Sequence, residues 1–203
     1  MTVEKGSAWG EPVIDPPPDL VSASSDADLA RLAAAGLQAD SRLVARVQGG
    51  DLLRTLGLDH PRSDESLHRY SMDLGLAVLD GHSADPRPFA AHLVARGRFW
   101  SGTSAVVMNA ALLGDLRLGP KAHPNDGLLD VTTGHLPMAQ RWEARRRARS
   151  GAHLPHPTLS TQRVPSWCVE LPKNTGVWLD GVRFGSARSI EVQVVPDAFF
   201  LVA

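Results

Sequence analysis

The sequence has a single cysteine, Cys168, and only three lysines among its 203 residues. One cysteine excludes a disulfide framework and a thiolate zinc finger. No run of about 18 apolar residues is present, which argues against a transmembrane helix, and the first residues lack the apolar core of a secretion signal. The formal net charge of −1 disfavours a general nucleic-acid-binding protein. We therefore expect a cytoplasmic protein with no nucleic-acid partner.

What is present indicates a folded chain. Hydrophobic residues make up 43% of the sequence, and 18 glycines punctuate it. The length suits one or two compact domains with a buried core. Residues 1–18, which end in Pro16, Pro17 and Pro18, predict an irregular N-terminal segment.

Residues 19–60 have the pattern of a small α/β layer. Short strands are predicted at 19–23 and 42–47, and helices at 28–35 and 51–56. Ser24, Ser25 and Asp26 supply a helix-start signal, because short oxygen-bearing side chains cap free backbone N–H groups. The alternation of strand and helix is typical of a parallel layer.

Residues 61–197 have a different pattern, with short alternating or apolar runs separated by Gly and Pro. These runs predict an antiparallel β-sandwich, interrupted by one Arg- and Ala-rich helix over 138–150. The apolar tail, residues 198–203, predicts a last strand that returns to the α/β layer. The expected fold class is therefore α+β, an antiparallel β-sandwich preceded by a truncated α/β layer.

The segment 119–131, Gly-Pro-Lys-Ala-His-Pro-Asn-Asp-Gly-Leu-Leu-Asp-Val, is the most informative in the chain. Asp126-Gly127 is a turn sequence, and Asp130 lies inside the apolar run that follows. Two hypotheses remain open. Asp126 and Asp130 either cap a loop-to-strand turn or, being carboxylates four residues apart, bind Mg²⁺ or Ca²⁺.

The same segment resembles the Pro-x-Ala-x-x-Asp-Asp-Gly-Leu-Leu-Asp-Val motif of the bacterial diacylglycerol kinase family, lipid kinases akin to sphingosine kinases. Residues 106–110 and 177–181 resemble other strands of that family, and the likeness covers roughly 69–203. The resemblance implies a C-terminal β-sandwich that packs against a nucleotide-binding domain and forms the lipid pocket. It also implies Mg²⁺ at Asp126 and Asp130.

The nucleotide motifs of that family are present here only in altered form. Asp26 falls on the Asp of Gly-Gly-Asp-Gly-Thr, but side chains replace its glycines, and Asp28 adds negative charge. Glycines are needed there because phosphates must approach the backbone closely. Asp51 and Arg54 match the second motif, Gly-Thr-x-Asn-Asp-x-x-Arg, whose Gly, Thr and Asn are replaced. Asp26, Asp51 and Arg54 are thus the remnants of a nucleotide site, and ATP binding is doubtful.

The Asp-Gly-Glu turn, whose Glu is the family's candidate base, reads Asp180-Gly181-Val182 here. Valine cannot accept a proton, so no catalytic residue is assigned. The two strand–helix units that precede the first motif in the family also lack counterparts before residue 19. These departures predict impaired phosphoryl transfer, which depends on positioning, Mg²⁺ and charge stabilisation.

The predicted helix over 138–150 is strongly basic. Its arginines are Arg141, Arg145, Arg146, Arg147 and Arg149, and Trp142 lies beside them. Two hypotheses remain open: a solvated helix face, or contact with anionic lipid headgroups at a membrane surface.

Three functions therefore remain open. The first is a lipid-kinase-like protein, catalytically impaired, that binds a lipid or other amphipathic ligand or serves as the partner of an active relative. The second is an active ATP-dependent lipid kinase with an atypical or shared nucleotide site. The third is a protein–protein module that pairs through the edge of the shortened α/β layer. Because such a layer should expose an apolar face, a homodimer is expected.

Overall fold

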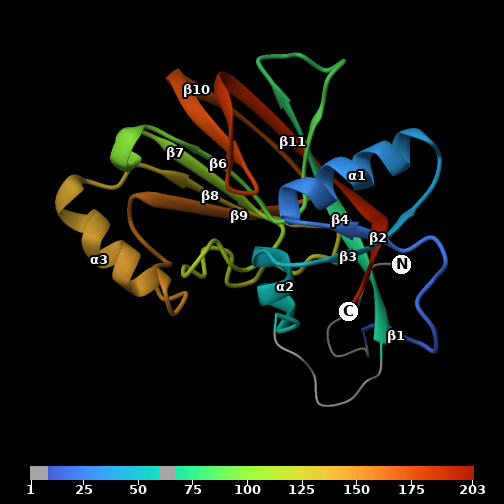
Figure 1. Ribbon diagram of the computed structural model, residues 1–203. Coiled ribbons are helices and arrows are strands. Elements are labelled where there is room, and N and C mark those ends of the chain that lie inside the picture. Colours follow the sequence, from blue (N-terminus) through green and yellow to red (C-terminus); the bar gives the residue numbers. More distant parts are fainter. Residues whose placement is uncertain (1–8, 60–66) are drawn as a thin grey trace.

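The computed structural model describes residues 9–59 and 67–203, and Figure 1 shows their arrangement. Eleven strands join in one continuous sheet, in which most neighbours are antiparallel. The strands are β1 (Glu11–Val13), β2 (Val21–Ala23), β3 (Leu43–Val47), β4 (Leu67–Leu79), β5 (Arg87–Phe89), β6 (His92–Arg96), β7 (Ser104–Met108), β8 (Leu129–Gly134), β9 (Leu159–Val164), β10 (Ser166–Leu179) and β11 (Val182–Val202). The helices are α1 (Asp26–Gln38), α2 (Asp51–Leu56), the short 3₁₀ helix η1 (Arg98–Trp100) and α3 (Met138–Ala148). The predicted α+β class, a mainly antiparallel sandwich with few helices, is confirmed.

The small α/β layer is built on parallel pairing. Strand β2 pairs in parallel with β3, and β3 pairs in parallel with the end of β11. Helix α1 begins at its cap, Ser25, whose Oγ accepts from the Asp28 N–H at 3.3 Å. Its buried face includes Leu29 and Ala33, which pack with Phe199 and Leu201 of β11 in one core. This layer is therefore joined to the sandwich through β11.

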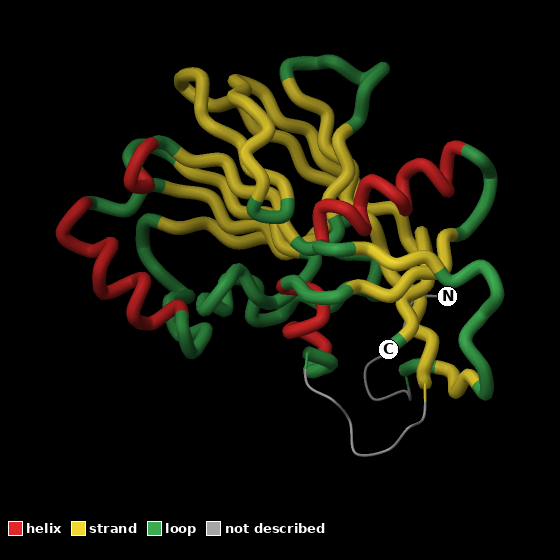
Figure 2. Tube along the Cα trace, viewed as in Figure 1, coloured by secondary structure: helices red, strands yellow, loops and turns green. Residues whose placement is uncertain are grey.

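Strands β4 and β11 are long enough to belong to both parts of the molecule. They pair antiparallel, with a register shift between Val195 and Phe199. Asp197 lies in that shift with a φ of 52°, which is typical of a bulge that bends a strand. The bend lets the first part of β11 cover the sandwich core and its end reach β3. Figure 1 labels both strands, and Figure 2 shows in yellow the sheet to which they belong.

The sandwich has its own core. Inward residues of β6, β7, β8, β10 and β11 meet there, among them Leu93, Val107, Leu129 and Ile190, all fully buried. Gly75 of β4 faces Phe89, whose ring lies where a side chain at position 75 would have to lie. The alternation of inward apolar and outward polar residues, the basis of the sequence prediction, follows from the pleat of each strand.

Helix α3 lies at the end of the sheet far from the C-terminus (Figure 1). Only Ala148 of this helix is buried. Its carbonyl accepts from the Arg117 N–H at 2.8 Å, which ties the end of the helix to the loop after β7. The helix is therefore attached at its C-terminal end, and its other side chains are exposed or half-buried.

Two expectations from the sequence were wrong. The N-terminal segment is not irregular throughout, because β1 pairs with the start of β4; its Pro12 is tolerated there because an edge strand need not donate on both sides. Residues 89–97, one of the short apolar runs that predict strands of the sandwich, do not form one strand but the last residue of β5 and all of β6. The run breaks at Ala90 and Ala91, because their N–H groups donate to the Asp180 carboxylate rather than to a strand.

Within the part of the chain that the structure describes, no helix combines the length and the hydrophobicity needed to cross a bilayer.

Candidate functional site

Asp26, the first residue of α1, lies against the start of α2. Its carboxylate is 5% exposed, and Oδ2 accepts from the N–H groups of Asp51 at 2.6 Å and Leu52 at 3.2 Å. The cap position of α2 is Gly50, which has no side chain to perform this role. A Cβ at Gly50 would lie 2.2 Å from Asp26 Oδ1, so glycine makes room for the carboxylate. Asp26 therefore caps a helix that is distant in sequence.

Asp51 connects α2 to the sandwich. Its Oδ2 lies 3.0 Å from Nε2 of His92, the first residue of β6, whose side chain is 3% exposed. The same carboxylate accepts from the Gly114 N–H, and Arg54 donates to its Oδ1 at 3.1 Å. Arg54 also donates to the Gly114 carbonyl at 2.6 Å. Two of the three predicted nucleotide residues, Asp51 and Arg54, are thus engaged by protein groups, as Asp26 is.

Asp180 completes the cluster from the turn between β10 and β11. Its carboxylate accepts from three successive N–H groups, those of Ala90, Ala91 and His92, at 2.8–2.9 Å. Its φ of 47° is one that Asp tolerates in tight turns. The fold therefore gathers Asp26, Asp51, His92 and Asp180, which we call the acid cluster, from parts of the chain far apart in sequence.

Burial and mutual repulsion set the charges in the acid cluster. Burial, together with the charge of Asp180, raises the pKa of Asp26 to about 7, although the N–H groups of α2 oppose the rise. Burial also raises the pKa of Asp180, against the nearby His92 and the three N–H donors. Burial alone would lower the pKa of His92, but its hydrogen bond to Asp51 and the surrounding carboxylates raise it overall. The pKa of Asp51 is lowered, since bonds from His92 and Gly114 outweigh its burial.

Two buried atoms of the cluster, Asp26 Oδ1 and His92 Nδ1, have no hydrogen-bond partner among the described residues. An unpaired oxygen on Asp26 suits a carboxyl that is readily protonated near neutral pH. The acid cluster can therefore bind and release protons near neutral pH. Its hydrogen bonds join the α/β layer to the sandwich.

The loop before α1 satisfies its own polar groups. The Asp28 carboxylate accepts from the Ser24 N–H at 3.0 Å and from Arg31 at 2.6 Å. These contacts lower the pKa of Asp28, so it is negative at neutral pH. Backbone N–H groups that a phosphate would need are thus occupied by serine and aspartate side chains.

Val182, at the position of the family's Glu, is 58% exposed at the start of β11. Glu191, further along β11, pairs with Cys168 and Val78 in the sheet register and is exposed. Neither residue supplies a carboxylate to the acid cluster.

Asp126 and Asp130 lie side by side, with Arg163 of β9 between them. Arg163 forms an ion pair with Asp126, and its Nε lies 3.3 Å from Asp130 Oδ1. Burial raises the pKa of both carboxyls against the charge of this arginine. Over residues 9–59 and 67–203, no group of three or more His, Cys, Asp or Glu side chains is arranged to hold a metal ion. The residues present suit an arginine counter-ion better than a divalent cation, and metal binding here stays a prediction.

The turn that carries Asp126 is held by a buried carboxylate that the sequence did not single out. Asp73 of β4, 1% exposed, accepts from the Gly127 N–H at 2.7 Å and the Asp197 N–H at 3.0 Å. Asn109 donates to the carbonyls of Asp73 and Ala90. Burial raises the pKa of Asp73 to about 6. This network ties the turn to β4 and to the bend in β11.

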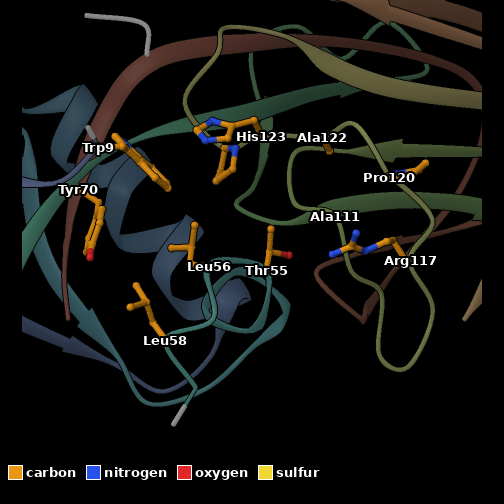
Figure 3. Close-up of a pocket in the computed structure, with 11 residues that line it drawn as sticks. Trp9, Thr55, Leu56, Leu58, Tyr70, Ala111, Arg117, Pro120, Ala122 and His123 are labelled. Atoms are coloured by element: carbon orange, nitrogen blue, oxygen red, sulfur yellow. The ribbon is translucent and has the colours of Figure 1, made fainter. Parts of the chain in front are cut away.

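Two cavities accompany these features. One, of about 390 Å³, lies beside α2 and is lined by Trp9, Tyr70, His123, Thr55 and Arg117 among others (Figure 3). Asp26, Asp51 and Asp180 do not line it. The Trp9 ring lies 5.1 Å from Tyr70 and 4.7 Å from His123, centroid to centroid.

The second cavity, of about 400 Å³, lies between α3 and the outer face of β7, β8 and β9. We call it the α3 cavity. Its walls are mostly apolar, including Val106, Leu116, Leu118, Leu136, Leu159 and Trp100, and Arg141 and Arg145 also line it. Its size and apolar lining are typical of a small-molecule site.

His92, Gly114 and Asp73 were missed in the sequence. His92 directly follows Ala90 and Ala91 at the start of a strand, and no spacing connects it to Asp51 or Asp180. The pairing of β6 with β10 brings His92 to Asp180, and the position of α2 against the sandwich brings Asp51 to His92.

Comparison with known proteins identifies relatives. The model of a family described as the YegS C-terminal NAD kinase beta sandwich-like domain matches residues 69–203. A solved structure of a diacylglycerol kinase from Bacillus anthracis str. Sterne is similar with a TM-score of 0.60 and 13% identity, over 90% of this chain and 75% of that one. Two structures described as candidate diacylglycerol kinases from the same organism give TM-scores of 0.63 and 0.62 at 12% and 14% identity, over 90% of this chain and 77% of each of theirs. At these identities the structural similarity shows a shared fold alone. No curated protein matches the sequence.

Proposed function

The chain belongs to the family of YegS C-terminal NAD kinase β-sandwich-like domains, and is thus diacylglycerol-kinase-like; from this premise we propose that it binds an amphipathic lipid without phosphorylating it. The ligand occupies the α3 cavity. ATP has no site in the acid cluster.

One observation supports the proposed loss of phosphoryl transfer. In the loop before α1, the Asp28 carboxylate accepts from the Ser24 N–H, and the Ser25 hydroxyl accepts from the Asp28 N–H. Side chains that replace the family's glycines and threonine therefore occupy backbone N–H groups that a phosphate would need. A triphosphate would have to displace these groups and approach the negative Asp28 carboxylate, so repulsion adds to the loss of donors. Val182 offers no base for the lipid hydroxyl.

The α3 cavity supports lipid binding. Its apolar walls suit an acyl chain, and Arg141 and Arg145 suit a polar or anionic head at its edge. His153, 8% exposed, also lines it, and burial lowers the pKa of this imidazole, so it is neutral near pH 7. A neutral wall with arginines at one edge orients an amphipath with its head toward those arginines.

Titration calorimetry with a short-chain diacylglycerol below its micelle concentration tests the binding. Ala144, on the cavity side of α3, is the residue to change. Ala144→Phe fills the cavity and should weaken binding at least about tenfold, since a ligand cannot share the space of the new ring. Ala139→Phe makes the same change on an exposed position of the same helix and should leave affinity within about twofold of the original.

Incubation with labelled ATP, Mg²⁺ and diacylglycerol in mixed micelles tests the loss of catalysis. No labelled phosphatidate above a protein-free control is expected. Turnover that disappears in Asp180→Asn would overturn this part of the proposal and favour the active-kinase alternative. Equal affinities for Ala144→Phe and Ala139→Phe would overturn the assignment of the α3 cavity.

A further inference from the structure

Large apolar side chains gather at the mouth of the α3 cavity. Seven such side chains are exposed among the described residues, and three of them are Phe99 (72%), Met138 (80%) and Trp142 (79%). Phe99 and Trp142 both line the cavity, and Met138 lies one turn before Trp142 on α3. The Phe99 carbonyl accepts from Arg141 Nη1 at 3.0 Å, which fixes η1 against α3. Apolar side chains grouped in this way mark a contact surface.

The backbone holds Phe99 outward at a cost. Phe99 and Trp100 have φ values of 52° and 60°, a conformation that bulky side chains rarely adopt. The Arg96 guanidinium lies 5.3 Å from the Trp100 ring and 4.3 Å from the Trp178 ring, so Trp100 is held against the sheet. Consecutive strained residues that expose an aromatic ring are better explained by a binding role than by stability.

Positive charge surrounds the same side chains. Six arginines lie on η1 and α3 or directly after it, namely Arg98, Arg141, Arg145, Arg146, Arg147 and Arg149. Two carboxylates pair with members of this set: Glu143 with Arg146 and Arg147, and Asp115 with Arg145 and Arg149. The excess of cations contrasts with the net charge of −1 for the whole chain. The surface is therefore locally cationic.

We propose that these side chains form a docking surface for an anionic lipid bilayer, with Phe99, Met138 and Trp142 among the headgroups. This α3 surface consists of those three residues and the six arginines. The inference rests on the proposed function, because docking turns the mouth of the α3 cavity toward the lipid that it would take up. Aromatic rings favour the headgroup region, and arginines favour anionic headgroups. Since either signal alone binds only weakly, their coincidence here favours a membrane.

Co-sedimentation with phosphatidylcholine vesicles, with and without phosphatidylglycerol, tests the docking. The protein should bind only the vesicles that contain phosphatidylglycerol, and added salt should release it. Phe99→Ala/Trp142→Ala should reduce the partition coefficient at least about tenfold. Ile14→Ala/Phe184→Ala removes two exposed apolar side chains elsewhere and should change it less than about twofold. Trp142→Ala alone, an exposed helix position, should give part of the loss without risk to folding.

Charge is tested by a second matched pair. Arg145→Gln/Arg149→Gln should weaken binding about 25-fold, the product of about fivefold for each arginine near an anionic surface. Arg183→Gln/Arg188→Gln changes the net charge equally on exposed positions of β11 away from α3 and should have little effect. Equal losses in the two pairs would show that only net charge matters and would overturn the assigned surface.

Absence of binding to phosphatidylglycerol vesicles would overturn the proposal, as would full binding by Phe99→Ala/Trp142→Ala. Concentration-dependent sedimentation that this double variant abolishes, without vesicle binding, would assign the α3 surface to a second copy of the chain instead. Calorimetry with soluble short-chain diacylglycerol separates the two proposals, because it measures the cavity without a bilayer. Cavity binding that persists while docking fails would overturn the docking alone.

Discussion

The acid cluster buries its charged groups inside the fold, whereas the α3 surface exposes most of its charged groups to solvent. In the acid cluster three carboxylates and His92 lie between the α/β layer and the sandwich. Backbone N–H groups and His92 form hydrogen bonds with these carboxylates. At the α3 surface all the arginines except the half-buried Arg141 are exposed, and the side chains of their partners Glu143 and Asp115 are exposed as well. Removing one partner of a buried charge lowers the free energy of unfolding strongly, whereas an exposed ion pair contributes little to it. The first region therefore holds the fold together, and the second is free to meet a ligand.

Asp180 should give the largest effect on folding. Asp180→Ala leaves the N–H groups of Ala90, Ala91 and His92 without their acceptor, and two of these residues are fully buried. A loss of at least about 3 kcal/mol in the free energy of unfolding is expected, from about 1 kcal/mol or more for each of the three unsatisfied donors. Asp180→Asn keeps an acceptor and tolerates the positive φ, so it should lose about half as much. Urea unfolding measures both, and equal losses would contradict the role of the carboxylate oxygens.

The pH dependence of stability comes next. The folded pKa of Asp26 is raised from 3.8 to about 7, so its ionisation disfavours the folded state and stability falls as the pH rises through this range. The pKa of His92 is also raised, so its contribution is present below its unfolded value of 6.5 and is lost as the pH rises through the folded value. Both groups therefore predict a lower melting temperature at pH 8 than at pH 6.

Asp26→Asn isolates the first of these contributions. Asparagine keeps an acceptor for the N–H groups of Asp51 and Leu52 but cannot ionise. At pH 8 the variant should be more stable than the original by about 1–3 kcal/mol, and the difference should shrink as the pH falls from 7 toward the unfolded pKa of 3.8. Thermal melts at several pH values measure this. A flat difference would mean that Asp26 does not titrate in this range.

Arg163 gives a smaller effect and tests the metal hypothesis. Arg163→Gln leaves Asp126 and Asp130, each 14% exposed, without their shared cation, and about 1–2 kcal/mol of stability should be lost. Millimolar Mg²⁺ should leave the melting temperature of the original unchanged and raise that of Arg163→Gln. A rise for the original protein, absent in Asp130→Asn, would instead establish a cation site in the presence of the arginine.

The sequence predicted the sandwich well because its signals are local. Alternation along β4 and the turn Asp126-Gly127 follow from neighbours in the chain. Asp26, Asp51 and Asp180 were identified from family motifs. A motif includes the residues of a three-dimensional site, which residue spacing alone does not reveal. His92 has no motif, and its partner Asp51 lies 41 residues away in sequence, so only folding reveals the pair. Strand β1 was not predicted, because glycine- and proline-rich segments lie on both sides of the three residues that pair with β4.

Arg141 gives the smallest effect, and it tests whether the two regions are independent. Its Nε donates to the Leu136 carbonyl at 2.9 Å and its Nη1 to the Phe99 carbonyl at 3.0 Å, so Arg141→Gln should cost about 1 kcal/mol of stability. The loss should be the same at pH 6 and pH 8, because no titrating group of the acid cluster contacts this residue. Double-variant melts with Asp26→Asn should then show additive changes. A coupling above about 0.5 kcal/mol would mean that the sheet transmits the charge state of the acid cluster to the α3 surface.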